Sequence, residues 1–314
     1  MRTELTEIAV VGAGSIGCSW AALALSRGLT VHLADPSETA REAAADAVTV
    51  RLADLRAPRD AAAKLVLHDD AAEAAAAADL VIEAGPERLD LKREMFAALD
   101  AAAAPDVLLA SSSSGFGPSS FQDGCAHPER VLVAHPFNPP HLIPLVEVVG
   151  GEATAETAVE AAFNVLEQLG RRPIRVRAEL PGHVVNRLQA ALWREAYDLI
   201  GRGAISVADL DLAVSNGPGL RWALLGPIAT QHLSGGPGGM AHVLEHLGPP
   251  MVDWWADLRE PELTPELTAQ LVSGVRSELA GEDEAVRQRR DAALQELLAL
   301  KARLGLDAES RGGR

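Results

Sequence analysis

The sequence predicts an α/β protein in which a doubly wound, largely parallel sheet is followed by an all-helical C-terminal domain. Two observations lead to this prediction. Short apolar runs alternate with helical stretches over residues 1–180, and strand signals stop after residue 181. Near-continuous apolar runs are typical of strands that helices cover on both faces, and their alternation with helices favours a doubly wound sheet.

Eight apolar runs in the first part of the chain are predicted to be strands. They cover residues 8–11, 29–34, 65–68, 80–83, 107–110, 131–134, 145–149 and 174–177. Stretches with helical periodicity lie between them, at residues 15–26, 38–53, 89–102 and 155–169. The alanine runs near residues 71–78 and 101–104 are interpreted as helix surface, because alanine is the best helix former.

Helical periodicity extends from residue 184 to residue 304. Clusters rich in glycine and proline are expected to interrupt it at residues 201–203, 216–219, 235–239 and 248–250. This change of pattern predicts two domains, residues 1–180 and residues 181–314. Since small-molecule sites often lie between domains, we expect the second domain to contribute to substrate binding.

The composition disfavours several classes of function. The chain has 28 basic and 44 acidic residues, and its net charge of −16 disfavours nucleic acid and anionic membranes as partners. Its apolar stretches are short and broken by charges, so no membrane span is expected. Residues 1–7 include two acids, which argues against a secretory signal. Cys18 and Cys125 are the only cysteines, which fits a cytoplasmic protein without a disulfide framework.

A glycine-rich turn joins the first predicted strand to the first predicted helix. It reads Gly12-Ala-Gly-Ser-Ile-Gly17. In this position the glycines allow a tight turn, leave room for a pyrophosphate and let the helix pack on the strand. The free amides and the dipole at the helix start then face the phosphates. We therefore expect a Rossmann-type dinucleotide site formed by Gly12, Gly14, Ser15, Ile16 and Gly17.

Asp35 follows the second predicted strand, about 20 residues after Gly12, at the place where dinucleotide-binding domains carry an acid. A carboxylate there accepts hydrogen bonds from the ribose hydroxyls and repels a 2′-phosphate. The alternative is an acid that only caps the next helix. Together with the glycine turn, Asp35 predicts NAD rather than NADP as the cofactor.

Polar side chains lie at the ends of later strands, where ligands of open α/β sheets bind. Four serines, among them Ser114, follow the fifth predicted strand. His135 follows the sixth strand, and Glu147 lies in the seventh. Asn186 comes much later, in the segment 181–187 that begins the second domain. The sheet topology allows these four side chains to meet at one edge.

With these motifs in order, the chain resembles the 3-hydroxyacyl-CoA dehydrogenase family over essentially residues 5–300. The matching stretches are the glycine turn, residues 81–87 (VIEAGPE) with Lys92, and residues 111–116, 135–139, 145–149 and 181–187. The resemblance implies an NAD(H)-dependent oxidoreductase that interconverts a 3-hydroxy acid, or a related secondary alcohol, and its 3-keto form.

The resemblance also implies residue roles that fit this chemistry. His135 would be the general acid/base and Glu147 would orient it, while Ser114 and Asn186 would hydrogen-bond the reacting oxygen. The expected cofactor contacts are Glu87, Lys92, Ser112 and Asn138. A hydrolase triad is disfavoured because no G-x-S-x-G elbow surrounds the serine. No metal is expected, since the H-x-x-E-H pattern at residues 242–246 lacks a third ligand.

The second domain departs from the acyl-CoA enzymes of the family. Residues 216–227 read NGPGLRWALLGP, where those enzymes usually have a G-x-x-x-G-P-F stretch. This resembles the branch that contains L-gulonate 3-dehydrogenase, a lens crystallin relative, and L-carnitine dehydrogenase, whose substrates are small hydroxy acids without CoA. Arg221 is a candidate carboxylate clamp, because a guanidinium binds a carboxylate through a bidentate fork. A surface or interface arginine is the alternative.

Two further residues are candidates for the wall of the substrate pocket. His183 replaces the aromatic residue that is usual in the family, and it is expected on the same helix face as Asn186. Trp222 follows the candidate clamp directly. For both side chains, packing in the protein core is the alternative interpretation, with packing at a dimer interface a further one for Trp222.

Other functions are compatible with the same residues. They are a ketoreductase acting on an aromatic polyketide intermediate in natural-product biosynthesis, a 3-hydroxyacyl-CoA dehydrogenase, and a non-catalytic, crystallin-like NAD-binding protein. The family precedent implies a homodimer assembled through the C-terminal domain. The apolar faces of its last helices, which include Leu294, Leu297, Leu298 and Leu304, suit such an interface.

Overall fold

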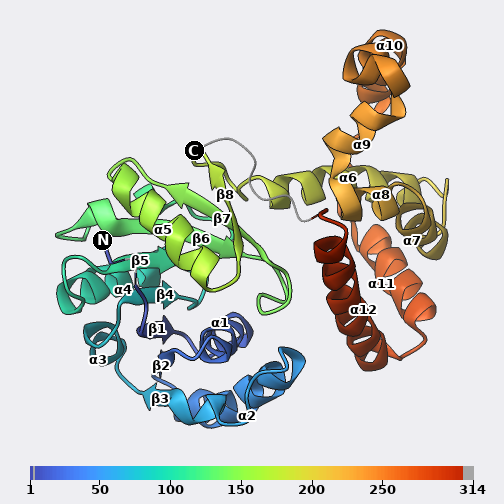
Figure 1. Ribbon diagram of the computed structural model, residues 1–314. Coiled ribbons are helices and arrows are strands. Elements are labelled where there is room, and N and C mark those ends of the chain that lie inside the picture. Colours follow the sequence, from blue (N-terminus) through green and yellow to red (C-terminus); the bar gives the residue numbers. More distant parts are fainter. Residues whose placement is uncertain (3, 307–314) are drawn as a thin grey trace. The chain divides into compact units, whose positions relative to one another are not determined.

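The computed structural model describes residues 1–2 and 4–306. Eight strands form one sheet in the order β3-β2-β1-β4-β5-β6-β7-β8 (Figure 1). Neighbouring strands are parallel except β6 and β7, which are antiparallel. The predicted doubly wound, largely parallel sheet is confirmed. The strands are β1 Glu7–Val11, β2 Thr30–Ala34, β3 Leu65–His68, β4 Leu80–Glu83, β5 Leu108–Ser111, β6 Val131–Pro136, β7 Leu145–Gly150 and β8 Arg172–Val176.

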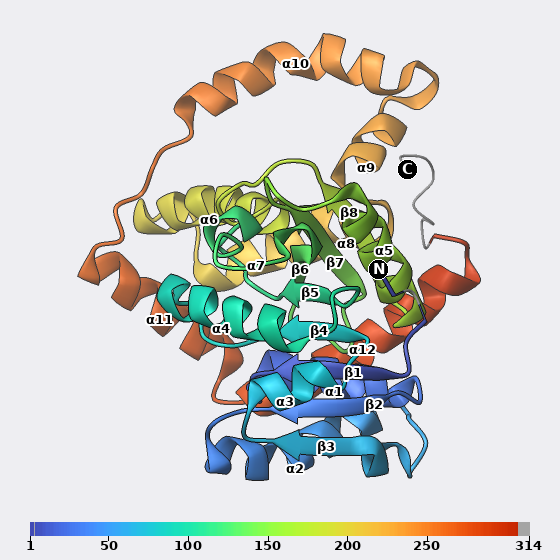
Figure 2. The ribbon, with the colours of Figure 1, turned by 90° about the vertical axis from the view of Figure 1, so that its left-hand side faces the viewer.

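Helices cover both faces of the sheet (Figures 1 and 2). α1 (Ser15–Ser26), α2 (Glu38–Asp54) and α5 (Glu156–Gln168) pack on one face, and α3 (Ala71–Ala76) and α4 (Leu89–Ala102) on the other. Successive side chains of a strand point to opposite faces. Ile8 of β1 therefore joins the apolar cluster under α1, whereas its neighbour Ala9 joins the cluster under α4.

The strand boundaries differ from the prediction in two places that concern the site, the first being β5, which ends at Ser111, one residue later than predicted. The second is β6, which continues two residues beyond the predicted end, through His135 and Pro136. The cause is the antiparallel partner β7, because the ladder between the two strands continues to the pair Pro136–Val146. A sequence pattern cannot show which strand lies alongside, so it ended the strand at the last apolar residue of the run.

The Asp79 carboxylate, just before β4, accepts hydrogen bonds from residues at the start of the chain. Burial raises the pKa of this carboxyl, but hydrogen bonds from the Thr6 amide and hydroxyl, from Arg2 and from the Glu7 amide outweigh this and lower the pKa to about 2. A lowered pKa stabilises the fold above the unfolded-state value, near pH 4, and this stabilisation is lost as the pH falls towards about 2.

We therefore expect Asp79→Asn to lower the free energy of unfolding at neutral pH by about 1–2 kcal/mol, after allowance for solvent screening. Urea unfolding at pH 7 and at pH 3 measures this, and the difference between variant and parent should shrink at the lower pH. Asp69→Asn, which removes a charge from the exposed loop after β3, is the control. An equal loss in both variants would contradict the assignment.

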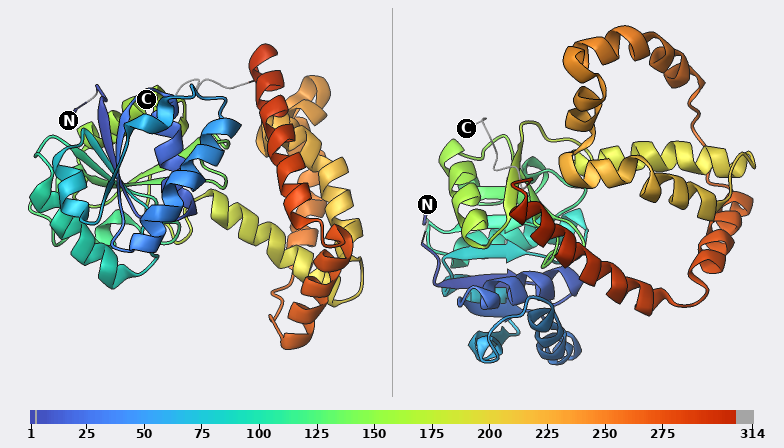
Figure 3. Two further views of the ribbon diagram at one scale, coloured as in Figure 1. Left: turned by 90° about the horizontal axis from the view of Figure 1, so that it is seen from below. Right: turned by 45° about the vertical axis from the view of Figure 1, so that its right-hand side comes forward.

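The chain divides into two compact units, Met1–Arg187 and a second that begins at Leu188. This division lies seven residues beyond the predicted boundary, because residues 183–186 hydrogen-bond to the serine loop and to Glu147 of the first unit. In the described residues the second part is helical. Its helices are α6 Val185–Gly201, α7 Val207–Asn216, α8 Pro218–Leu225, α9 Pro227–Ser234, α10 Gly239–Asp257, α11 Pro265–Leu279 and α12 Asp283–Arg303 (Figure 3).

One predicted interruption in this part was wrong. α10 runs through residues 248–250, with Pro249 and Pro250 inside it. A proline removes one backbone donor and disfavours a helix interior, which is why the pattern predicted a break. Because the two prolines are adjacent, the missing donors fall within one turn, and the helix is regular on either side. No helix among the described residues is long and apolar enough to span a bilayer.

Candidate active site

Four polar side chains share one face of the sheet. Val81, Leu109 and Val133 belong to the apolar cluster under α4. Two residues further along the same strands come Glu83, Ser111 and His135, which period-two alternation therefore places on the α4 face as well. Glu147, in β7, lies on this face two residues before the clustered Val149. The ends of three strands and the neighbouring β7 thus bring these groups together, as parallel topology requires.

His135 and Glu147 form a buried pair. They are direct partners in the antiparallel ladder of β6 and β7, which puts their Cβ atoms side by side. Nδ1 of His135 lies 2.9 Å from Oε2 of Glu147, and both side chains are almost fully buried. The ring of Phe137 packs edge-on against the imidazole at 4.7 Å between centroids. The ring is therefore fixed, with Nε2 as its remaining polar atom.

The second oxygen of Glu147 is held by the backbone. The amides of Val184 and Val185 donate to Oε1 at 3.0 and 2.9 Å. Burial raises the pKa of Glu147, but the hydrogen bonds from His135 and from these two amides outweigh burial and leave the pKa below its ordinary value. Glu147 is therefore ionised at neutral pH and can stabilise a protonated imidazole.

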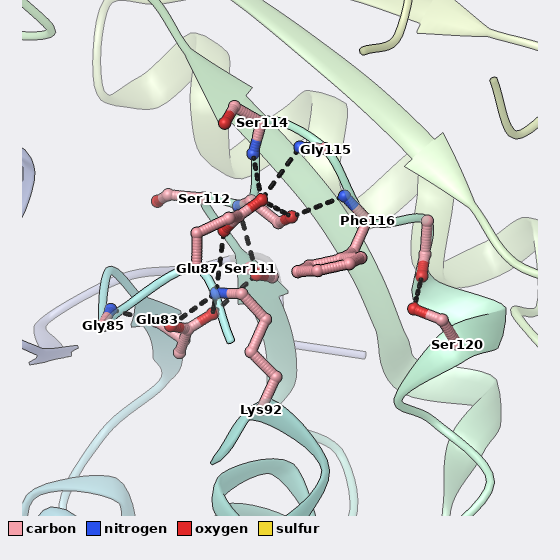
Figure 4. Close-up of polar contacts among 12 residues, drawn as sticks. Glu83, Gly85, Glu87, Lys92, Ser111, Ser112, Ser114, Gly115, Phe116 and Ser120 are labelled. Atoms are coloured by element: carbon pink, nitrogen blue, oxygen red, sulfur yellow. Dashed lines mark hydrogen bonds and ion pairs between the residues drawn. The ribbon is translucent and has the colours of Figure 1, made fainter. Parts of the chain in front are cut away.

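The serine loop after β5 is fixed by Glu87, as Figure 4 shows. Oε1 of Glu87 accepts hydrogen bonds from the Ser113 hydroxyl at 2.6 Å and from the amides of Ser114 and Gly115 at 3.1 and 2.9 Å. Burial raises the pKa of Glu87, but these donors and Lys92 lower it overall. A carboxylate with several donors around one oxygen determines the backbone conformation of this loop.

Sequence reasoning missed Glu83 as a site residue. Glu83 is fully buried at the end of β4 and contacts Nζ of Lys92 with both oxygens, at 3.0 and 2.9 Å. The Ser111 hydroxyl donates to the same carboxylate at 2.6 Å (Figure 4). A buried charge is stable only when it is paired and hydrogen-bonded. A glutamate that ends an apolar strand, followed nine residues later by a lysine, was the available signal.

His183 lies where the prediction did not put it. It is not on a helix face with Asn186, because α6 begins only at Val185 and His183 has a positive φ of 52° in the preceding turn. Its side chain is fully buried, Nε2 lies 3.1 Å from the Ser113 carbonyl oxygen, and its ring lies 5.2 Å from that of His135. Burial lowers the pKa of His183 against the opposing effect of the Ser113 carbonyl. A neutral ring with the proton on Nε2 fits these contacts.

Ser114 and Asn186 meet across the same loop. Nδ2 of Asn186 lies 3.5 Å from the Ser114 carbonyl oxygen; Ser114 is exposed and Asn186 is partly buried. The segment 183–186 therefore hydrogen-bonds to the serine loop through two side chains and to Glu147 through two amides. The structure brings the four predicted catalytic residues into one neighbourhood within the first unit.

The glycine turn fits a bound dinucleotide. Gly12 has a φ of 106°, and a Cβ there would lie 2.6 Å from the Ala84 carbonyl oxygen. A Cβ on Gly17 would lie 1.8 Å from the Gly12 carbonyl oxygen, so the helix can pack this closely only on a glycine. By contrast, a Cβ on Gly14 would meet nothing within 4 Å. Gly14 therefore leaves open space above the amides that begin α1, where a pyrophosphate would bind.

Asp35 lies at the end of β2 beside this turn. Its Oδ2 accepts from the Ala13 amide at 2.9 Å, and its Oδ1 accepts from the Ser37 amide at the same distance. The helix cap itself is Ser37, whose hydroxyl accepts from the Ala40 amide. Asp35 is therefore a link between the glycine turn and the start of α2, and each carboxylate oxygen retains a lone pair for a ribose hydroxyl.

A cavity of about 240 Å³ connects the predicted cofactor and catalytic residues. Its wall contains seven of the residues that the sequence singled out. The lining is Ile16, Ala84, Gly85, Glu87, Lys92, Ser112, Ser114, His135, Pro136 and Asn138. The cavity lies within the first unit, and the His135 imidazole, the predicted general acid/base, is part of its wall.

Arg221 and Trp222 lie on α8, in the second unit. Arg221 is exposed, and the Trp222 side chain is 40% exposed. Their predicted contact with substrate stays a prediction.

A strand–glycine turn–helix unit next to a buried histidine–carboxylate pair defines a nucleotide-dependent oxidoreductase. The chain belongs to the 3-hydroxyacyl-CoA dehydrogenase family: residues 7–179 match its NAD-binding domain and residues 182–277 its C-terminal domain. It is an NAD-dependent hydroxy acid dehydrogenase. The family resemblance and the cofactor predicted from sequence are both confirmed.

Two relatives of similar sequence carry different names. An L-carnitine dehydrogenase of Streptomyces coelicolor is 44% identical over 98% of each chain. A 3-hydroxyacyl-CoA dehydrogenase of Gibberella moniliformis is also 44% identical, over 97% of each chain. A solved structure of 5-formyl-3-hydroxy-2-methylpyridine 4-carboxylic acid 5-dehydrogenase, described as an NAD⁺-dependent dismutase, aligns with a TM-score of 0.83 at 30% identity. That alignment covers 95% of this chain and 99% of the other.

Proposed function

We propose that this enzyme oxidises a small, CoA-free 3-hydroxy acid of the L-carnitine type to its 3-keto form. The observation that supports the chemistry is the buried His135–Glu147 pair, whose imidazole opens on the same cavity as the predicted cofactor residues. The substrate class is supported by the near full-length relatives named L-carnitine dehydrogenase and by the NGPGLRWALLGP stretch that replaces the acyl-CoA pattern.

His135 moves the proton. With Nδ1 engaged by Glu147, Nε2 is the atom left to accept the hydroxyl proton of the substrate, and it returns that proton in the reduction. Ionised Glu147 stabilises the imidazolium and fixes the tautomer. Ser114 and Asn186 hold the reacting oxygen through hydrogen bonds, which strengthen as negative charge develops there. NAD, when bound, supplies the acceptor for the hydride that leaves the carbinol carbon.

The cofactor is held by the glycine turn and by the cavity wall. Gly12 and Gly14 form the turn, the free amides of Ser15 and Ile16 at the start of α1 bind the pyrophosphate, Gly17 lets the helix approach, and Asp35 binds the adenosine ribose. Glu87, Lys92, Ser112 and Asn138 line the part of the cavity next to His135. His183 is reassigned from a substrate contact to a positioning residue, because its ring is buried behind the serine loop.

A substrate panel tests the proposed function. NAD reduction is measured with L-carnitine, L-gulonate, free 3-hydroxybutyrate and 3-hydroxybutyryl-CoA, and NADH oxidation with bulky aromatic diketones. We expect kcat/KM for a free hydroxy acid to exceed that for the thioester by at least about tenfold, a difference of about 1.4 kcal/mol. A preference for the thioester or for the diketones would replace the proposal with acyl-CoA dehydrogenation or ketoreduction. NADH binding without turnover on any compound would indicate the crystallin-like role.

Arg221 is proposed as the clamp for the substrate carboxylate. Arg221→Leu is expected to raise KM for an acidic substrate by about tenfold or more while kcat changes little, because a guanidinium–carboxylate fork binds ground state and transition state alike. Arg259→Leu, at another exposed position of the second unit, is the matched control. An unchanged KM in Arg221→Leu would contradict a role of Arg221 in binding the substrate carboxylate.

The C-terminal helices are proposed to assemble the enzyme as a homodimer in the cytoplasm. Figure 3 shows α9 and α10 extending away from α6–α8 within the second unit. α10 packs on α9 and carries exposed Leu244, Trp254 and Trp255. Large exposed apolar and aromatic side chains gathered on one helix are typical of a subunit interface. The two free, buried cysteines support a reducing compartment. Sedimentation of the purified enzyme should give the mass of two chains.

A further inference from the structure

Arg51, which no motif singled out, lies beside the first turn of α1. It is on α2, which packs along α1. Its Nη2 donates to the Ser15 hydroxyl oxygen at 3.1 Å, and its Nε donates to the Ser19 hydroxyl oxygen at 3.0 Å. Its Nη1 donates to the Ala47 carbonyl oxygen at 2.8 Å. Three bonds in different directions therefore fix the guanidinium plane over one face of α1.

The hydrogens of the two serines are used differently. A hydroxyl has one hydrogen to donate and two lone pairs to accept with. Ser19 donates its hydrogen to the Ser15 carbonyl oxygen at 2.8 Å. Within the described residues, the Ser15 hydroxyl takes part only as an acceptor, from Arg51. Since Arg51 occupies one lone pair of this oxygen, the hydrogen of Ser15 points away from the guanidinium.

We propose that Arg51 is a positioning residue for the cofactor: it orients the Ser15 hydroxyl so that its hydrogen is donated to the pyrophosphate of bound NAD. Ser15 is the first residue of α1, where free amides and the helix dipole favour an anion. Hydrogen bonds to an ionised acceptor are stronger than neutral ones, so an oriented donor there increases cofactor affinity. The proposal rests on the proposed role of Ser15 in NAD binding and is independent of the substrate.

His141 connects the same serine pair to the loop that follows β6. Its Nδ1 lies 3.3 Å from the Ser19 hydroxyl oxygen, and its Nε2 lies 3.3 Å from Oδ2 of Asp54 on α2. His141 is therefore buried between α1 and α2. The loop after His135 and the glycine-turn helix share this polar network, which limits the movement of Arg51.

A double-mutant cycle on cofactor binding tests this role without turnover. The affinities of Arg51→Met, Ser15→Ala and the double variant are measured for NADH and for ADP-ribose by titration of the intact enzyme. We expect each single variant to bind both ligands about tenfold more weakly, as for loss of one hydrogen bond to a charged group. The double variant should bind no more weakly than Ser15→Ala, because Arg51 acts through that hydroxyl.

Two controls separate positioning from general damage. Arg59→Met removes a positive charge from an exposed site near the end of α2 and should leave both affinities unchanged. Competition by adenosine, which has no phosphate, should be the same in every variant. If Arg51→Met does not fold, Arg51→Gln takes its place in the cycle.

If the losses of NADH binding free energy in Arg51→Met and Ser15→Ala add up in the double variant, the proposal is overturned. Arg51 would then act on the cofactor directly or through the fold. An equal loss of adenosine affinity would also overturn it. Unchanged NADH affinity in Ser15→Ala would instead remove Ser15 from the cofactor site. The substrate panel is unaffected by each of these outcomes, so failure here is distinguishable from failure of the proposed reaction.

Discussion

Replacing His135 by asparagine is expected to lower kcat by about three orders of magnitude, because a positioned general acid/base contributes about 10²–10⁴-fold. Asparagine can still donate to Glu147 from a similar position, so the variant keeps the buried hydrogen bond but cannot take up a proton. NADH affinity should stay within about twofold, since the loss concerns an interaction of the transition state. Steady-state kinetics and a separate NADH titration measure the two quantities.

The matched control is His127→Asn, which alters a half-exposed histidine of the same unit whose side chain pairs with Glu129. It should leave kcat unchanged. A His135→Asn enzyme with more than about a tenth of the parent kcat would exclude His135 as the proton-transferring group. A large loss of NADH affinity together with the loss of kcat would indicate collapse of the cavity instead.

The second large effect is expected for Glu147→Gln. The glutamine side chain fits the same space, and its oxygen can still accept from the Val184 and Val185 amides. Its amide group would face Nδ1 of His135 as a donor, which reverses the tautomer and removes the negative charge that stabilises the imidazolium. We expect kcat for oxidation to fall by about 10²–10⁴-fold, as when the orienting carboxylate of a triad is neutralised.

The pH profile distinguishes this loss from a structural one. The pKa of Glu147 is lowered, so its carboxylate is ionised at neutral pH. The negative charge can therefore stabilise the protonated His135 imidazole throughout the neutral pH range. Without the charge, protonated imidazole is less stable, so the acid limb of kcat/KM for oxidation should move to lower pH. Glu160→Gln, on the exposed surface of α5, is the control and should keep both rate and profile. A lower kcat with an unshifted profile would contradict the proposed role.

The elements that position the site were predictable because each has a local signal. β3, β4, α1 and α4 have the predicted bounds, since near-continuous apolar runs and helical periodicity depend only on neighbouring residues. The glycine turn was predictable for the same reason. By contrast, Pro249 and Pro250 carry a strong local signal for a break, and the continuous helix α10 overrides it.

The candidate site was predicted unevenly. His135, Glu147 and the serine loop lie in motifs, so the resemblance located them. Glu83 was missed because its function comes from burial and from Lys92, which approaches from α4. His183 was placed on a helix face because its spacing from Asn186 fits a helix, whereas a positive φ turns the chain before α6 begins.

The sequence by itself determined the fold class, the cofactor and the chemical types of the site residues. These depend on periodicity, on glycines that no other residue can replace, and on motif order. Only the tertiary structure decided which groups touch: the antiparallel register of β6 and β7 pairs His135 with Glu147, and the turn before α6 brings two amides to the same carboxylate. Such contacts join residues far apart in the chain, and their register is a property of packing that no local pattern contains.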